Sequence, residues 1–418
     1  MTTAAAPTES RTARRYDTDP YAGPYADPDT DPYADLYDGP YAERYGTDRY
    51  DAVVAGGGPA GAAAALTLAR AGRTVLLADA GGGPSKTGES LVPAARLLLH
   101  DLGVDIRSLD ADHRPCRATL SAWGSPHLHR TDFITDPYGH GWHLDRPAFD
   151  RLLRAAVRTH RADVAERATV THPAPHPGGG WQVTVRADGA ARPVRCRWLV
   201  DATGRRASLA TRCGARRHRY DRLIAVHLRL TAGPADSEGA SLVESAPDGW
   251  WYTAPHTPAH RLVTYFTDTD LAPPGLGHPG AFLDRLAATR HTARLAVGRS
   301  PLAGASPRRC AAHTARLEPL AGEGWIAAGD AAIAFDPLSS QGILTALYSG
   351  LCAGQAIDAR LRGEAGALDG YAARLGETFD AYRYGHRQIH IGEERWHSRP
   401  FWQRRRSPGG PGSLAHFI

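Results

Sequence analysis

Lysine is almost absent from this chain, because Lys86 is the only lysine among its 49 Lys and Arg residues. No run of 18 or more apolar residues occurs, and the N-terminus lacks the basic-then-apolar pattern of a signal peptide. The five cysteines are odd in number and none form a Cys-x-x-Cys pair, so neither a disulfide framework nor a zinc site is suggested. We therefore expect a cytoplasmic protein with no membrane partner.

The charge is unevenly distributed along the chain. Residues 1–50 carry ten acidic residues and five arginines, whose charges sum to −5, so the total of +5 leaves +10 for the remainder. This basic body could attract an anionic cofactor or an acidic peptide, or it could simply be a solvated, arginine-rich surface. We expect no nucleic-acid partner.

The first 49 residues differ in composition from the rest. Pro-Tyr-Ala occurs four times, starting at Pro20, Pro24, Pro32 and Pro40, in a segment rich in Asp, Pro, Gly and Tyr and poor in aliphatic residues. Such a segment buries too little apolar area to offset its ordering entropy, so residues 1–49 are predicted to be a disordered tail. Its tyrosines either bind a partner or remain solvated.

From Tyr50 onward, apolar strands alternate with helices, which predicts an α/β fold. Strands are predicted at 51–55, 74–78, 181–186, 195–200, 223–230, 261–267 and 324–328. Helices are predicted at 59–71, 90–102, 147–159 and 342–359, and the chain from Tyr382 on is predicted to be a helix followed by a frayed basic tail.

A glycine-rich turn lies between the first strand and the first helix. Its sequence, Gly56-Gly57-Gly58-Pro59-Ala60-Gly61, fits G-x-G-x-x-G in the required strand–turn–helix context. Gly56 permits the tight turn, Gly58 leaves room for a pyrophosphate, and Gly61 allows close helix–strand packing. The helix N-terminus offers free N–H groups to the phosphates. Asp79 closes the second strand, where a carboxylate accepts hydrogen bonds from an adenosine ribose, so a dinucleotide site is predicted.

Two further segments favour FAD over NAD. Residues 325–332 end a strand with Gly329-Asp330, and Pro337 then precedes Gly342-Ile343 at the start of the long helix. Residues 201–205, which include Gly204, follow another apolar strand. The arrangement resembles flavoprotein hydroxylases, which implies that Asp330 contacts the ribityl–phosphate portion of FAD and that the helix start faces the pyrimidine edge of the flavin.

From Tyr50 to about Trp402 the chain resembles the flavin monooxygenase and halogenase superfamily, and within it the LodB/GoxB-like flavoproteins. The segments that carry this resemblance are residues 88–93, 121–125, 141–146, 249–255 and 335–343. The resemblance implies that Gly88, Glu89 and Ser90 lie near the flavin and that Arg146 supports the FAD domain. LodB and GoxB relatives help to build a cysteine tryptophylquinone in a partner enzyme by oxygenating a peptidyl tryptophan, which implies a peptidyl substrate.

These observations predict an α/β protein in which a Rossmann-like FAD-binding domain is interleaved with a β-sheet substrate domain. The FAD-binding domain is predicted to comprise residues 50–112, 140–215 and 313–365, and the substrate domain residues 113–139 and 216–312. Residues 366–418 are predicted to form C-terminal helices and a basic tail.

The departures from the halogenase pattern argue against halogenation. The resemblance implies that a halogenase needs a lysine in its substrate tunnel, but no lysine follows Lys86. Where tryptophan halogenases have Pro-Leu-Glu-Ser-Thr-Gly, this chain has Pro337-Leu338-Ser339-Ser340-Gln341-Gly342, so Ser339 replaces the acid. Their Trp-x-Trp-x-Ile-Pro stretch is also altered, at Tyr252 and Ala254.

We therefore predict an FAD-dependent monooxygenase that hydroxylates an electron-rich aromatic small molecule, peptide or protein, with O2 as oxidant. Electrons would come from NAD(P)H or from a separate flavin reductase. Trp251, with Trp123, Trp250 and Tyr252, either forms an aromatic wall for the substrate or packs in the core. His143 either shuttles protons or is a structural histidine.

Two other function classes stay open. One is a flavin-dependent dehydrogenase or reductase acting on an isoprenoid-type substrate, whose tunnel should be aliphatic. The other is a non-catalytic flavin-bearing maturation partner that escorts a precursor protein.

Overall fold

A computed structural model describes residues 49–81, 90–233, 236, 238–257 and 259–406. All of the described residues belong to one compact unit, Tyr45–Ile418. The predicted tail lies outside the described residues, except for Arg49, which begins the first strand. Three candidate residues, Lys86, Gly88 and Glu89, also lie outside the described residues.

The larger sheet has eight strands and a parallel centre, in the order β19-β20-β11-β1-β2-β8. The parallel strands are β1 (Arg49–Ala55), β2 (Val75–Ala78), β8 (Asp163–Ala165), β11 (Ala190–Asp201) and β20 (Trp325–Ala327). Strands β9 (Ala168–Pro175), β10 (Trp181–Ala187) and β19 (Ala321–Gly322) add antiparallel pairs. Every residue of β2 is buried, as expected of a central parallel strand. The Rossmann-like prediction is confirmed.

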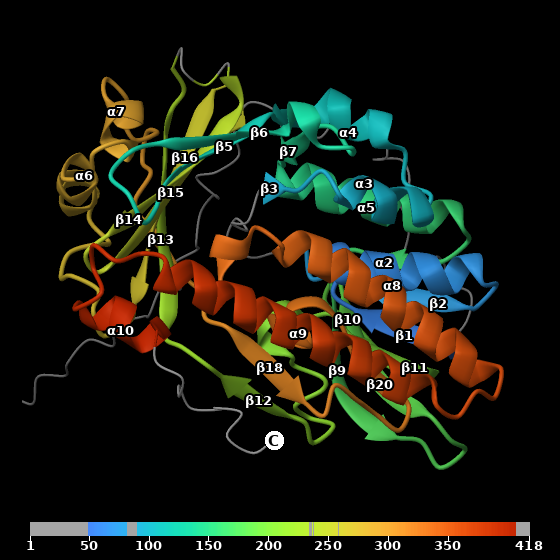
Figure 1. Ribbon diagram of the computed structural model, residues 1–418. Coiled ribbons are helices and arrows are strands. Elements are labelled where there is room, and N and C mark those ends of the chain that lie inside the picture. The colour runs from blue at the N-terminus through green and yellow to red at the C-terminus, as the bar shows by residue number, and fades with distance from the viewer. Residues whose placement is uncertain (1–48, 82–89, 234–235, 237, 258, 407–418) are drawn as a thin grey trace, which may run out of the picture. The chain divides into compact units, whose positions relative to one another are not determined.

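Helix α2 (Pro59–Arg70) packs against α5 (Arg146–Thr159) and α8 (Gly342–Leu361), and α8 packs against α9 (Ala367–Ile391) (Figure 1). The predicted helix at 90–102 is wrong at its start. Ser90–Leu91 forms strand β3, and helix α3 begins only at Ala95. Pro93 explains the difference, because a proline disfavours helical backbone in the residue before it. The chain continues into α4 (Ile106–Asp112).

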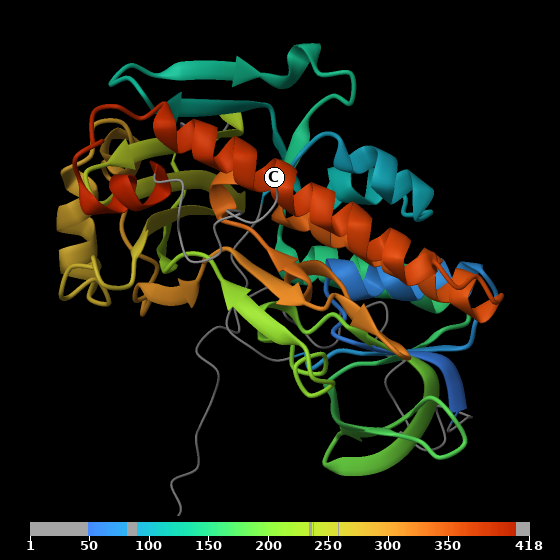
Figure 2. The ribbon, with the colours of Figure 1, turned by 60° about the horizontal axis from the view of Figure 1, so that its bottom comes forward.

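The second sheet has seven strands in the order β17-β13-β16-β15-β14-β5-β6. Their bounds are β5 (Ala118–Ala122), β6 (His129–Asp132), β13 (Leu223–Thr231), β14 (Ala240–Ala246), β15 (Gly249–Thr257), β16 (His260–Asp268) and β17 (Arg308–Ala311). One face packs against α6 (Pro279–Ala287), beside α7 (Thr292–Ala296), and the other against α10 (Pro400–Arg406). Figure 2 shows α9, in red, running alongside the teal segment that contains β5.

Two three-stranded sheets complete the described part of the fold. One joins β12 (Arg216–Arg219), β18 (Ala315–Glu318) and β21 (Ile333–Ala334), and the other joins β3, β7 (Gly141–His143) and β4 (Arg114–Cys116). Tyr45–Ile418 is one compact unit, so the predicted domain boundaries within it stay a prediction. No helix in the described part of the chain is long and apolar enough to cross a membrane.

Candidate functional site

Four loops meet at one edge of the parallel sheet. Gly56 follows β1, Asp79 follows β2, Ala202 follows β11 and Ala328 follows β20. These strands are neighbours, and the chain moves outward from β1 to β2 on one side and to β11 on the other. Parallel sheets bind ligands at the carboxyl ends of their strands, at such a reversal of strand order. This edge is therefore the candidate binding site.

The turn after β1 and the start of α2 are packed so tightly that neither Gly56 nor Gly61 has room for a side chain. Gly56 has a φ of +104°, and a Cβ atom there would overlap the carbonyl of Ala202. A Cβ atom on Gly61 would overlap the carbonyl of Gly56. Helix α2 then starts at Pro59, and because its N-cap residue is Gly58, no side chain caps the helix. Its first N–H groups are thus available to an anion.

Asp79 is held at the rim of this turn. Its Oδ2 accepts a 2.7 Å hydrogen bond from Gly57 N, and its Oδ1 accepts one of 2.9 Å from Gly81 N. Arg154 Nη1 lies 4.0 Å from Oδ1, and the Asp79 side chain is 14% exposed. A carboxylate has about four lone-pair sites, so Asp79 can still accept a hydroxyl such as that of a ribose.

The loop after β11 is shaped by Asp201, which is buried and fully hydrogen-bonded. Its Oδ1 accepts from the N–H and hydroxyl of Thr203, at 2.9 and 2.7 Å. Its Oδ2 accepts from Leu209 N and Ala210 N, at 2.8 and 2.7 Å. Asp201 therefore supports the 3-10 turn η4 (Gly204–Arg206), in which Gly204 has a φ of +67° and nothing lies within 4 Å of its Cβ position.

The loop after β20 rests on helix α2. It forms the 3-10 turn η6 (Gly329–Ala331), in which Gly329 has a φ of +62°. The side chain of Asp330 is 39% exposed, and its Oδ2 lies 3.3 Å from Arg205 Nε. The structure thus brings the three segments expected to bind FAD to one place, while their contacts with FAD stay a prediction.

The turn before α8 is stabilised by Asp336. This residue caps η7 (Pro337–Ser339), and its Oδ1 accepts a 2.9 Å hydrogen bond from Leu338 N. Ser339 Oγ donates to the carbonyl of Asp336 at 3.2 Å, which accounts for Ser339 as a turn residue and leaves its catalytic role a prediction. No side chain caps the N-terminus of α8, and nothing lies within 4 Å of a Cβ position on Gly342.

Ile343, the next residue, is buried, whereas no residue of η7 is. Asp336 itself is fully buried, and its Oδ2 lies 2.9 Å from His386 Nε2, on α9. Burial opposes ionisation of Asp336, but the hydrogen bond and the charge of His386 lower its pKa overall. Sequence reasoning missed His386, because fifty residues separate it from Asp336 and no local motif links the two.

Arg146 and Ser90 occupy the neighbouring elements. Arg146 is buried at the start of α5, and its Nη2 donates to Asp150 Oδ1 at 3.2 Å. Ser90, on β3, pairs with His143, on β7. These contacts give Arg146 and Ser90 structural roles, and their contacts with FAD stay a prediction.

His143 is enclosed by protein. Its ring is fully buried, and Nε2 lies 3.1 Å from the carbonyl of Gly239. Burial lowers the pKa of His143 to about 4, so the imidazole is neutral at pH 7. A neutral, buried ring fits a structural histidine, and the proton-shuttle role of His143 stays a prediction.

The aromatic candidates lie on opposite faces of the second sheet. Trp251 is buried in a cluster with Tyr265 and Phe282 of α6. Trp250 stacks on Phe266 on the other face, with a centroid distance of 3.8 Å. Packing accounts for Trp251 without a ligand, so its catalytic role stays a prediction.

The face that carries Trp250 also approaches the turn before α8. Trp123, Tyr252 and Trp396 are partly buried there, packed against the same cluster as Leu338 of that turn. Trp396 was not among the sequence candidates, because it follows the last long helix and matches no motif. These three side chains are therefore the better-placed candidates for an aromatic wall.

A depression of about 600 Å³ lies between the end of α8 and the start of α9, where Gln355 and Arg374 line it. It is at the far end of α8 from Gly342, roughly 20 Å away at 1.5 Å per helical residue. We therefore do not assign it to the site.

The loops fit an FAD molecule. The helices α2 and α8 present uncapped N-termini, which suit a pyrophosphate and an electron-rich ring. Asp79 and Asp330 offer partly exposed carboxylates that suit hydroxyl donors. The glycines leave the backbone open to close approach.

Comparison with known proteins supports this fit. Residues 49–375 match the family model described as an FAD binding domain. The chain is 30% identical over 367 residues to the putative FAD-dependent oxidoreductase LodB of Marinomonas mediterranea, covering 86% of this chain and 97% of that protein.

Two solved structures are also similar. The myxobacterial chondrochloren halogenase CndH has a TM-score of 0.79 at 24% identity, covering 86% of each chain, which shows a shared fold. The peptidyl tryptophan dihydroxylase QhpG, essential for tryptophylquinone cofactor biogenesis, has a TM-score of 0.72 at 27% identity, covering 88% of this chain and 81% of that one.

Proposed function

Since this chain belongs to the FAD binding domain family and is an FAD-dependent oxidoreductase, we propose that it is a monooxygenase acting on a peptidyl tryptophan. In the proposed reaction one atom of O2 is inserted into a C–H bond of the indole ring. The other atom leaves as water, with two electrons and two protons supplied by NAD(P)H or by a separate flavin reductase.

The observation that carries this proposal is a group of three partly buried aromatic residues, Trp123, Tyr252 and Trp396, which pack against the same cluster as Leu338. Because Leu338 lies in the turn that leads into α8, the wall is next to the place where the flavin edge is expected. Aromatic side chains stack on an indole through offset or edge contacts. An isoprenoid substrate would instead favour an aliphatic lining, so the wall supports an aromatic substrate.

The similarity to LodB and to QhpG favours a peptidyl over a free aromatic substrate. QhpG is a peptidyl tryptophan dihydroxylase, and this chain covers 81% of it at 27% identity. Halogenation is less well supported, because the chain has no lysine after Lys86 and has Ser339 in place of the expected acid.

The protein's contribution would be position and charge. FAD supplies the redox chemistry when it is bound. The N-terminus of α8 would stabilise negative charge on the ring that faces it, and the N-terminus of α2 would hold the pyrophosphate. Asp336 keeps the turn before α8 in shape by accepting a hydrogen bond from Leu338 N.

Mass spectrometry of peptides tests this proposal. The FAD-loaded protein is given NADPH, or a flavin reductase with NADH, together with peptides that differ only in carrying Trp, Tyr or Leu. Oxygenation predicts a gain of one or two oxygen atoms on the Trp peptide, labelled when 18O2 is supplied and unchanged when chloride or bromide is added.

Other products would replace the proposal. A halide-dependent gain of bromine or chlorine means halogenation, and hydrogenation of an isoprenoid alkene with no peptide oxidation means a reductase. If the flavin is neither reduced nor reoxidised with any substrate while a precursor protein still binds, the chain is a non-catalytic maturation partner.

A further inference from the structure

Three side chains able to bind a metal converge behind the turn that precedes α8. The potential ligand atoms of Asp336, His386 and His390 all lie within 4.8 Å of one another. His386 and His390 are four residues apart on α9, so they project from the same face of the helix. Asp336 faces them from the cap of η7.

His390 has a ring nitrogen that is suited to a ligand. Its Nδ1 lies 2.8 Å from the carbonyl oxygen of His386, so Nδ1 must carry the proton to donate. That leaves a lone pair on Nε2, which is buried and has no hydrogen-bond partner among the described residues. Metal-binding histidines commonly donate their other N–H to a backbone carbonyl, which fixes the tautomer as seen here.

Asp336 and His386 form the other half of the group. Asp336 Oδ1 is oriented by the hydrogen bond from Leu338 N, and Oδ2 lies 2.9 Å from His386 Nε2. Two ligands on one tetrahedral ion are about 3.3 Å apart when each bond is about 2.0–2.1 Å. The pair is thus within about half an ångström of a chelating geometry. The His386 side chain is 15% exposed, which provides an entry route from solvent.

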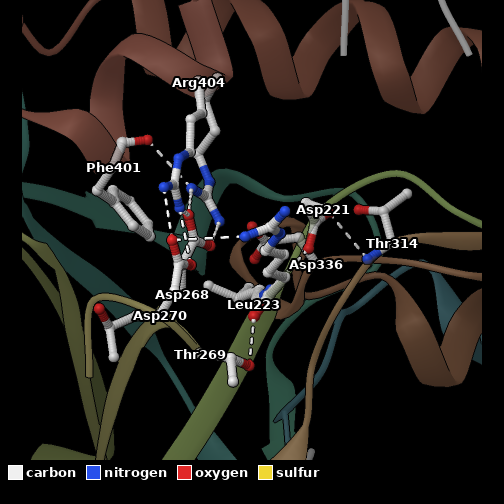
Figure 3. A network of polar contacts seen from close by, with 12 residues as sticks. Asp221, Leu223, Asp268, Thr269, Asp270, Thr314, Asp336, Phe401 and Arg404 are labelled. Carbon is white, nitrogen blue, oxygen red and sulfur yellow. Dashed lines mark hydrogen bonds and ion pairs between the residues drawn. The ribbon is translucent and has the colours of Figure 1, made fainter. Parts of the chain in front are cut away.

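The charges around the group are mixed, with an arginine and carboxylates both close to it. Arg405 lies near the group, but its guanidinium is bonded to both oxygens of Asp268, at 2.7 and 3.2 Å. A second carboxylate, Asp221, lies close to Asp336 and accepts from Thr314 N at 3.0 Å (Figure 3). Both Asp336 and Asp221 are thus available to offset the charge of a dication.

We propose that Asp336, His386 and His390 bind one divalent ion of the zinc class, with a fourth position open to water. Two imidazole nitrogens and one carboxylate oxygen suit borderline first-row ions better than calcium or magnesium, which prefer all-oxygen sites. The ion would fasten α9 to the turn before α8. This inference does not depend on the identity of the substrate.

The test measures zinc in the purified protein without an affinity tag, because a histidine tag would itself bind metal. FAD-loaded protein is dialysed against micromolar Zn²⁺ and then against metal-free buffer. Elemental analysis should find about one zinc per chain, and X-ray absorption at the zinc edge should show nitrogen and oxygen ligands at about 2.0–2.1 Å.

Matched variants locate the site. His390→Gln keeps the volume and can still donate to the His386 carbonyl, and His386→Ala removes the second ligand. Each should weaken zinc binding at least about 100-fold, since even the partners of metal ligands contribute 10–100-fold. His397→Ala removes a nearby histidine that bonds Glu394 and should leave binding unchanged.

The FAD content and thermal unfolding of each variant show whether it is folded. Zinc should raise the unfolding temperature of the wild type and of His397→Ala but not that of His390→Gln. A wild type that retains less than about a tenth of a zinc per chain overturns the proposal, as does equal binding by wild type and the folded His390→Gln variant. In either case the three residues form only a hydrogen-bonded network.

Discussion

A Cβ atom on Gly329 would lie 2.7 Å from the Cβ of Ala60, so the loop after β20 rests directly on the first turn of α2. The two segments are far apart in the sequence. They can touch because residue 329 is a glycine, which has no side chain to meet Ala60 and which adopts a φ of +62°. Their contact places Asp330 beside the uncapped N-terminus of α2.

Gly329→Val should greatly reduce FAD binding. The side chain must push the loop away from Ala60, and valine is strained at positive φ. We expect the purified variant to hold less than about a tenth of the wild-type FAD, measured by the ratio of absorbance at 450 to 280 nm. Gly370→Ala, within α9 with nothing near its Cβ position, should keep full FAD content. A fully flavinated Gly329→Val variant would contradict this prediction.

Asp79→Ala should weaken FAD binding by about 10–100-fold. The carboxylate both orders the turn through Gly57 N and offers an acceptor to the ribose, and a hydrogen bond to a charged group contributes about 1.5–3 kcal/mol. Fluorescence titration of the apoprotein with FAD measures the change. Asp112→Ala, at an exposed position, is the control. If both variants bind FAD equally well, the ribose role of Asp79 is wrong.

The sequence predicted the parts of the site that depend on local geometry. The turn at 56–61 and the loop at Gly329-Asp330 each lie at a strand end, and the need for glycine there is visible as a motif. The sequence did not predict the partners of Asp336. His386 and His390 come from a helix whose packing depends on tertiary contacts, and a spacing of four residues on a helix is common without function.

The burial of the aromatic residues also could not be predicted from the sequence. Trp250 and Trp251 are adjacent in the chain, yet they lie on opposite faces of β15, because successive strand residues alternate. Which face meets the turn before α8 depends on where α10 and Leu338 pack. The string of aromatic residues therefore indicated a candidate wall that includes Trp123 and Tyr252, but it did not separate them from Trp250 and Trp251 or indicate Trp396.

This alternation gives a prediction that separates substrate binding from stability. Tyr252→Leu should raise the KM for a tryptophan peptide by about 3–10-fold, because it removes the interaction energy of one aromatic pair. The unfolding temperature should change little. Trp251→Leu should instead lower the free energy of unfolding by about 2 kcal/mol or more, because it leaves a cavity beside Phe282. Its KM should stay within about twofold of wild type. The opposite pattern would place the substrate on the α6 face of the sheet.

Acidification should destabilise the protein between about pH 6.5 and pH 4, and His143 contributes to that loss. Burial lowers the pKa of folded His143 to about 4, whereas the pKa of an unfolded histidine is about 6.5. Between these values the unfolded chain binds the extra proton, so the free energy of unfolding falls as the pH falls. A shift of this size corresponds to about 3 kcal/mol for this fully buried ring.

Urea unfolding at pH 7, 6 and 5 with saturating FAD measures this dependence. Burial also lowers the pKa values of His227 and His256 to about 4, so they act in the same direction, and the wild type should lose stability steeply. His143→Gln can still donate to the Gly239 carbonyl but cannot take up a proton. The slope of its free energy of unfolding against pH should therefore be smaller than that of the wild type, by an amount that corresponds to at most one proton per chain. An unchanged slope in a folded His143→Gln variant would mean that His143 titrates normally, as a ring open to solvent and able to shuttle protons would.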